Sequence, residues 1–119
     1  MKISYGSSEV EKQCKSLREA QKLFGGNKAL ANSLLSRVNA IDQATVIKDI
    51  IRTKPFRFHK LEADYNGLFA IDVKTIRDKW RIILQPLDSN DQPYDPCHID
   101  EIADVVTNIK IKEVSGHYE

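Results

Sequence analysis

The sequence has few cysteines and no long apolar run. Only two of its 119 residues are cysteines, Cys14 and Cys97, too few for a disulfide framework. No window reaches membrane-spanning length, and the opening MKISYGSSEVEK lacks the apolar centre of a secretion signal. We therefore expect a cytoplasmic protein with reduced thiols and no membrane partner.

Several catalytic and cofactor motifs are missing as well. Cys97 is followed by His98, but no second ligand pair stands at zinc-finger spacing. The only glycine pair, Gly25-Gly26, suits the end of a helix rather than a phosphate-binding loop. No Ser-His-Asp order stands out from chance. We expect neither a metal nor a cofactor.

Length and charge favour one domain with two unlike surfaces. A chain of 119 residues, 41% apolar and 29% charged, suits a single globular domain, which we place over residues 1–119. The net charge of +1 conceals a segment of +4 at residues 52–85 and one of −6 at residues 86–104. The first could meet a phosphate backbone, with the second turned away from it. Alternatively, both are ordinary solvated surface.

The N-terminal half predicts a strand and two helices. Alternation indicates a strand over residues 2–5, and Ser8 with Glu11 has the spacing of a capping box. Gly25-Gly26 ends the first helix, and Asn27 caps the second; the short connection predicts an antiparallel hairpin. The first apolar stripe is Val10, Cys14, Leu17, Ala20 and Phe24; the second is Leu30, Leu34, Val38 and Ile41.

The C-terminal half predicts strands. A short helical turn is expected within residues 45–52, and Pro55 disfavours helix at Lys54. Strand-like runs cover residues 68–73, 80–86 and 105–114, with an acidic excursion at 87–104 that holds one helical turn at 99–102. This order predicts an α+β fold, in which the first strand and the helix hairpin pack on one face of a mainly antiparallel sheet of about four strands.

Alternation along the strands separates two sheet faces. The helix stripes need an apolar face to cover. The other face collects polar and cationic residues that no helix has to cover. The apolar set is Phe69, Ile71, Val73, Trp80, Ile82, Leu84, Ile109 and Ile111; the polar set is Asp72, Arg81, Gln85, Lys110 and Lys112.

Basic and ring-bearing residues flank these strands, and we expect a sheet to bring them to one edge. Cationic groups hold phosphate, histidine or tyrosine moves protons, and rings stack on unpaired bases, so this combination suits RNA. These residues also have structural interpretations. Arg57 and Lys60 can be solvated loop residues, and His59 can bind a loop carbonyl. Arg81 can instead be paired with Asp72, and His117 and Tyr118 can be frayed near the terminus. The expected set is Arg57, His59, Lys60, Arg81, Lys110, His117 and Tyr118.

Four ordered blocks carry a resemblance: RFHKL (57–61), NGLFAIDV (66–73), WRIILQP (80–86) and IKIKEVSGHYE (109–119). With them the chain resembles the RelE/ParE superfamily of bacterial toxins over nearly its whole length, and most closely the HigB-like plasmid maintenance killer group. In that group Arg-Phe-His-Lys-Leu precedes a strand ending in Val-Asp-Ile. A Tyr-Arg-Leu-Ile-Phe strand follows, and Glu-Val-x-Asp-Tyr-His closes the chain.

The resemblance implies a cytoplasmic toxin of a type II toxin–antitoxin system and a RelE-like fold. Such a toxin is a metal-independent endoribonuclease that cuts mRNA in the A site of the 70S ribosome and arrests growth. Its partner is a helix-turn-helix, HigA-like antitoxin, and it meets DNA only through that complex. By this resemblance Arg81 stabilises transition-state charge, and His59, His117 or Tyr118 moves protons. The RNA-binding set is Arg57, Lys60, Arg77, Lys110 and Lys112.

The chain departs from the group at several positions. Glu62 replaces a basic residue, Asp72 replaces an arginine, and Gly116-His117-Tyr118 replaces Asp-Tyr-His. The connection KTIRDKW is longer and puts Arg77 at its tip, where it can replace a missing cation. Two other functions therefore stay open: a non-catalytic, ParE-like toxin that binds DNA gyrase, or an inactivated relative that only binds its antitoxin.

Overall fold

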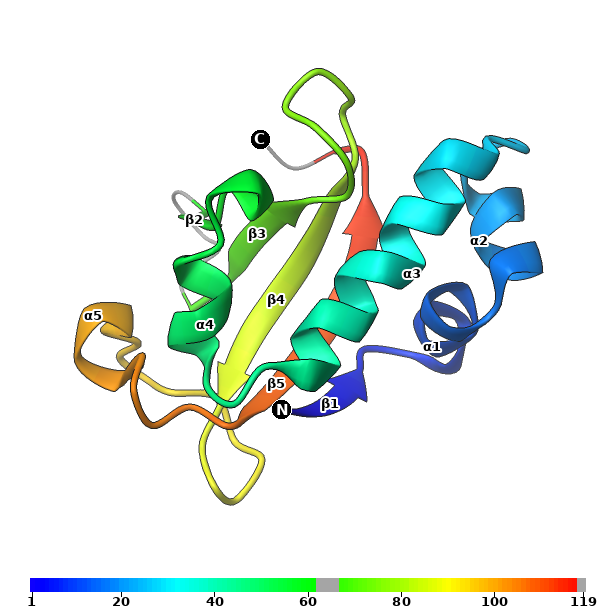
Figure 1. Ribbon diagram of the computed structural model, residues 1–119. Coiled ribbons are helices and arrows are strands. Elements are labelled where there is room, and N and C mark those ends of the chain that lie inside the picture. The colour runs from blue at the N-terminus through cyan, green and yellow to red at the C-terminus, as the bar shows by residue number, and fades with distance from the viewer. Residues whose placement is uncertain (62–66, 118–119) are drawn as a thin grey trace.

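A sheet of five strands, in the order β1-β5-β4-β3-β2, organises the chain (Figure 1). The computed structural model describes residues 1–61 and 67–117. β1 runs parallel to β5, and the other neighbouring strands are antiparallel. The elements are β1 (Lys2–Tyr5), α1 (Ser8–Lys15), α2 (Leu17–Leu23), α3 (Lys28–Gln43), α4 (Ile47–Ile51), the 3-10 turn η1 (Lys54–Phe56), β2 (His59–Lys60), β3 (Phe69–Asp72), β4 (Arg81–Leu87), α5 (Ile99–Ile102) and β5 (Asn108–Ser115).

The α+β class is confirmed, but the expected four-stranded sheet is wrong. The two-residue β2 pairs with β3 and adds an edge strand inside a stretch predicted to be irregular. Helix was also not expected at Lys54, yet η1 begins there, with Pro55 inside its first turn, where a missing N–H costs nothing. The short helices expected near residues 45–52 and 99–102 are present as α4 and α5.

The first predicted helix is two helices. The backbone at Ser16 is extended, and its side chain accepts the Glu19 N–H at 3.3 Å, so α2 begins with a new cap. The predicted capping box at Ser8 is also wrong, because Ser7 caps α1 by accepting the Val10 N–H at 3.2 Å. The break moves Leu17 off the apolar stripe, and its side chain is 42% exposed.

The second helix forms as predicted. Asn27 accepts the Leu30 N–H at 3.0 Å, after Gly25 and Gly26 end α2 with φ of 63° and 91°. α3 crosses the sheet and α4 lies on the same side (Figure 1). The stripe residues of α3 are all buried: Leu30, Leu34, Val38 and Ile41.

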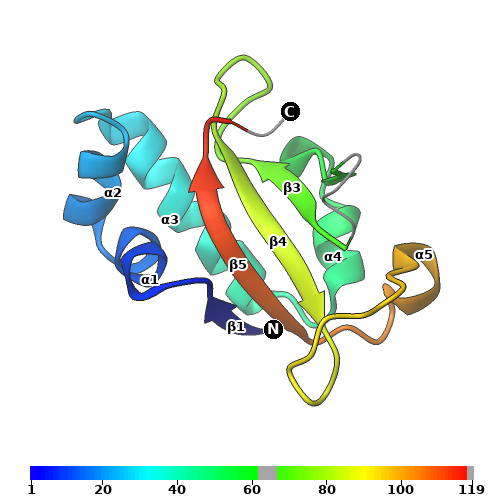
Figure 2. The ribbon, with the colours of Figure 1, turned by 180° about the vertical axis from the view of Figure 1, so that it is seen from behind.

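The two sheet faces differ less in burial than the alternation of apolar and polar residues predicts. The apolar face is buried under the helices, with Ile82 paired to Ile71 and Val114. No described helix lies across the reverse face (Figure 2), yet Ala70 and Ile83 are fully buried there. Trp80, predicted on the apolar face, is half-buried and meets Phe24 edge to face at 4.9 Å between ring centres.

Both cysteines are free and buried. Burial raises the pKa of the Cys14 thiol to about 12, so this side chain behaves as an inert core residue. Among the described residues, no helix combines the length and the apolar character needed to cross a membrane.

Candidate functional site

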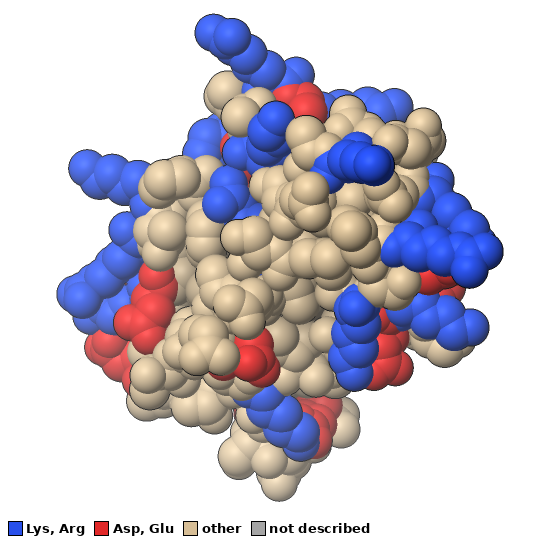
Figure 3. All heavy atoms as spheres, turned by 45° about the vertical axis from the view of Figure 1, so that its right-hand side comes forward, with Lys and Arg blue, Asp and Glu red and all other residues tan. Residues whose placement is uncertain are grey.

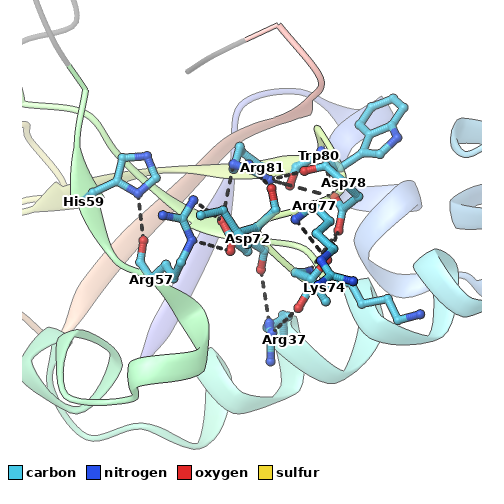
Figure 4. Close-up of polar contacts among 11 residues, drawn as sticks. Arg37, Arg57, His59, Asp72, Lys74, Arg77, Asp78, Trp80 and Arg81 are labelled. Carbon is cyan, nitrogen blue, oxygen red and sulfur yellow. Dashed lines mark hydrogen bonds and ion pairs between the residues drawn. The ribbon is translucent and has the colours of Figure 1, made fainter.

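Asp72 lies at the end of β3 between two arginines (Figure 4). Its carboxylate accepts two hydrogen bonds from Arg57, at 2.7 Å to Nε and 3.1 Å to Nη2. From the paired strand, Arg81 places its Nε 3.3 Å from the same carboxylate. Asp72 is 1% exposed, so its negative charge is held inside the protein by both guanidinium groups.

Arg81 is buried, contrary to the expectation of an open polar face. Its side chain is 5% exposed. Beyond Asp72, its guanidinium donates to the carbonyl oxygens of Asp78 and Trp80, each at 2.8 Å, and of Ile76 at 3.4 Å. The expected solvent-facing arginine is instead a brace beneath the hairpin of residues 73–80. The alternative pairing with Asp72 is the one observed.

Arg37 on α3 joins this cluster from the helix side. It donates to the carbonyl oxygens of Asp72 at 3.1 Å and Lys74 at 3.0 Å, and its guanidinium lies 4.5 Å from the Phe56 ring centre. Partial burial lowers its pKa, although an arginine stays charged. Arg37 was not predicted from the sequence as a site residue. The available signal was its position next to Val38, at the border of an apolar stripe.

His59 lies on β2, opposite Ala70. Its Nδ1 is 2.7 Å from the Arg57 carbonyl oxygen, which can only accept, so Nδ1 carries a proton. In the neutral ring Nε2 is then the basic nitrogen. The half-buried imidazole is thereby held next to Arg57, which occupies the left-handed region with φ of 51°.

The C-terminal end of β5 reaches the same end of the sheet. Ser115 pairs with Arg81, and the exposed His117 follows two residues later. Gly116 packs under the hairpin residue Lys79, because a Cβ built on Gly116 would lie 2.9 Å from the Lys79 Cε. His117 and the hairpin are therefore neighbours. Tyr118 and Glu62 lie outside the described residues.

Three of the predicted cations lie elsewhere. Lys60 pairs with Phe69 and lines a cavity of about 330 Å³ with Cys97 and the acidic start of α5. Lys110 pairs with Gln85, four residues along β4 from Arg81. Lys112 is exposed at the β-bulge of β5, beside α1. The other predicted residues that the structure describes lie at the end of the sheet that carries the β3–β4 hairpin, which we call the hairpin end: Arg57, His59, Arg77, Arg81 and His117.

No protein-family model matches this sequence, and no curated protein matches it. Among the described residues, no three or more His, Cys, Asp or Glu side chains lie close enough together to bind a metal ion.

Proposed function

We propose that the chain is the toxin of a type II toxin–antitoxin system, a ribosome-dependent endoribonuclease that cuts mRNA in the A site. The observation that carries the proposal is the hairpin end itself. There an oriented histidine, a second exposed histidine and several cations share one end of the sheet. Together with the resemblance in the four sequence blocks, this combination favours RNA cleavage over other chemistry.

The proposed reaction uses the ribose 2′-hydroxyl as nucleophile. His59 Nε2 takes the hydroxyl proton while the 2′-oxygen bonds to the adjacent phosphorus. The bond from phosphorus to the 5′-oxygen breaks, and His117 or Tyr118 donates a proton to that leaving oxygen. The products are a 2′,3′-cyclic phosphate and a 5′-hydroxyl end. Arg57 and Arg77 stabilise the phosphate charge, and Arg81 acts as a positioning residue because its guanidinium is buried.

The proposal includes the partners that the resemblance implies. A helix-turn-helix antitoxin neutralises the toxin in the cytoplasm, and DNA is reached only through that complex. Lys60, Lys110 and Lys112 lie away from the hairpin end, so we assign them to contacts with the ribosome or with more distant parts of the message.

The test maps new RNA 5′ ends minutes after the protein is induced, beside three variants. We expect in-frame cuts within translated messages for the native chain. His59→Ala should reduce cutting about 100-fold or more because the base is lost, and His117→Ala should reduce it if that residue is the acid. Arg18→Ala is the control, because Arg18 is an exposed arginine on α2. Undiminished cutting by His59→Ala would exclude this mechanism.

One observation favours a second candidate. Asp72 stands where the group has an arginine and pairs with both Arg57 and Arg81, so its carboxylate offsets one of their two positive charges. This suits a non-catalytic protein, either a toxin that binds gyrase or a relative that only binds its antitoxin. Growth arrest with DNA breaks and no new RNA ends would support the gyrase inhibitor. No arrest and no new ends would support the inactive relative.

A further inference from the structure

The hairpin between β3 and β4 turns its cations outward and its only carboxylate inward. Lys74, Arg77 and Lys79 are exposed. Asp78 is half-buried, and its carboxylate accepts the Thr75 N–H and the Trp80 N–H, each at 2.9 Å. The outer surface of the loop is therefore positive, although its sequence includes an acid.

The same loop is fixed from within by hydrogen bonds. The Thr75 hydroxyl accepts the Arg77 N–H at 3.2 Å. From below, Arg81 binds the carbonyl oxygens of Ile76, Asp78 and Trp80. A loop that is already ordered loses little conformational entropy when a ligand binds, so it suits recognition better than a flexible one.

The hairpin tip also exposes an apolar side chain. Ile76 is 61% exposed and lies next to Arg77. In the view of Figure 3, Lys and Arg are spread over the face and its edges, several of them beside acidic residues. There Lys15 pairs with Glu11, and Lys22 pairs with Glu19. Among the described residues, no ion pair joins Lys74, Arg77 or Lys79 to an acidic side chain; the Lys79 Nζ lies 5.6 Å from the Trp80 ring centre.

We propose that this hairpin is a preformed clamp for the ribose–phosphate backbone of single-stranded RNA, separate from the residues that move protons. Lys74, Arg77 and Lys79 contact successive phosphates, and Ile76 packs against a ribose or base. Asp78, Thr75 and Arg81 are positioning residues that hold the clamp in shape. The inference deepens the proposed function and rests on its assignment of RNA as the substrate.

The first test measures binding rather than cutting. Fluorescence anisotropy with a labelled, 2′-O-methylated single-stranded oligoribonucleotide, which cannot be cleaved, gives Kd over a range of salt concentrations. We expect Lys74→Ala and Arg77→Ala each to flatten the plot of log affinity against log salt by about 0.7. Arg18→Ala on α2 should leave the slope unchanged. Equal slopes for Arg77→Ala and the native chain would overturn the clamp.

The second test separates shape from charge. Asp78→Asn removes one negative charge, which favours RNA binding, but it also removes one of the two carboxylate acceptors that hold the loop, which weakens binding. If the clamp must be braced, binding weakens about fivefold; if only charge matters, binding tightens. Asp100→Asn makes the same charge change on the exposed face of α5, at the other end of the sheet. Tightening by Asp78→Asn equal to that by Asp100→Asn would overturn the bracing role.

Thr75→Ala provides a milder variant that changes no charge. It removes the acceptor of the Arg77 N–H, so we expect weaker binding with an unchanged salt slope. Native affinity in this variant would count against bracing. Because the cleavage test uses the histidine variants, the two proposals fail separately. Normal oligoribonucleotide binding by the hairpin variants would overturn the clamp and the phosphate contact of Arg77, while the roles proposed for the histidines would stand.

Discussion

Asp72→Ala is expected to lower the free energy of unfolding by about 3–5 kcal/mol, because the buried Arg81 guanidinium loses its nearest counter-charge and keeps only the Asp78 carboxylate, 3.8 Å away. Arg81 is 4% exposed and cannot turn toward water without giving up three carbonyl contacts. Arg57 also loses a two-bond partner. Urea denaturation followed by circular dichroism measures the change.

The matched control for this prediction is Asp104→Ala. Asp104 also pairs with a cation, Lys48 at 2.9 Å, but its side chain is 72% exposed, so we expect a loss of about 0–1 kcal/mol. The double variant Asp72→Ala with Arg81→Met should be more stable than Asp72→Ala alone, because no unpaired buried charge remains at Arg81. Equal losses for Asp72→Ala and Asp104→Ala would show that the buried pair contributes no more than a surface one.

The elements of the fold that follow from local chemistry were predictable. Asn27 caps α3 and the glycines before it end α2, because capping depends on a few adjacent residues. The break at Ser16 was not predicted. An apolar stripe continues across it in the sequence, and only the cap formed with Glu19 shows that the helix restarts.

The candidate site was less predictable, because its contacts join distant parts of the chain. Alternation placed Arg81 and Asp72 on the same face, but their pairing depends on the register between β3 and β4. Arg57 reaches Asp72 from a turn of left-handed backbone that the sequence does not reveal. The burial of these charged strand residues could therefore be recognised only from the structure.

This burial changes how a loss of function in Arg81 variants is to be read. An Arg81→Ala protein loses the brace under the hairpin as well as a charge, so inactivity would not separate chemistry from shape. His59 and Arg77 are better probes, since one is half-buried on an edge strand and the other is exposed. Variants at these two positions test proton transfer and phosphate contact without removing a buried ion pair.

Leu34→Ala is expected to lower the free energy of unfolding by about 2–5 kcal/mol, through lost burial and the cavity that remains. Leu34 is 0% exposed, at the centre of the α3 stripe that packs on the sheet. Urea denaturation measures the loss. Leu17→Ala is the same substitution on a 42% exposed side chain, and should change stability by about 0.5 kcal/mol or less.

This contrast bears on the hairpin end as well as on the core. Arg37, one helical turn after Leu34, donates to the backbone carbonyls of Asp72 and Lys74. Ser33, directly before Leu34, donates its hydroxyl to the Val73 carbonyl at 2.6 Å. The packing of Leu34 therefore sets the position from which α3 holds the start of the hairpin. If Leu34→Ala cost no more than Leu17→Ala, α3 would not be packed on the sheet, and it could not position the hairpin.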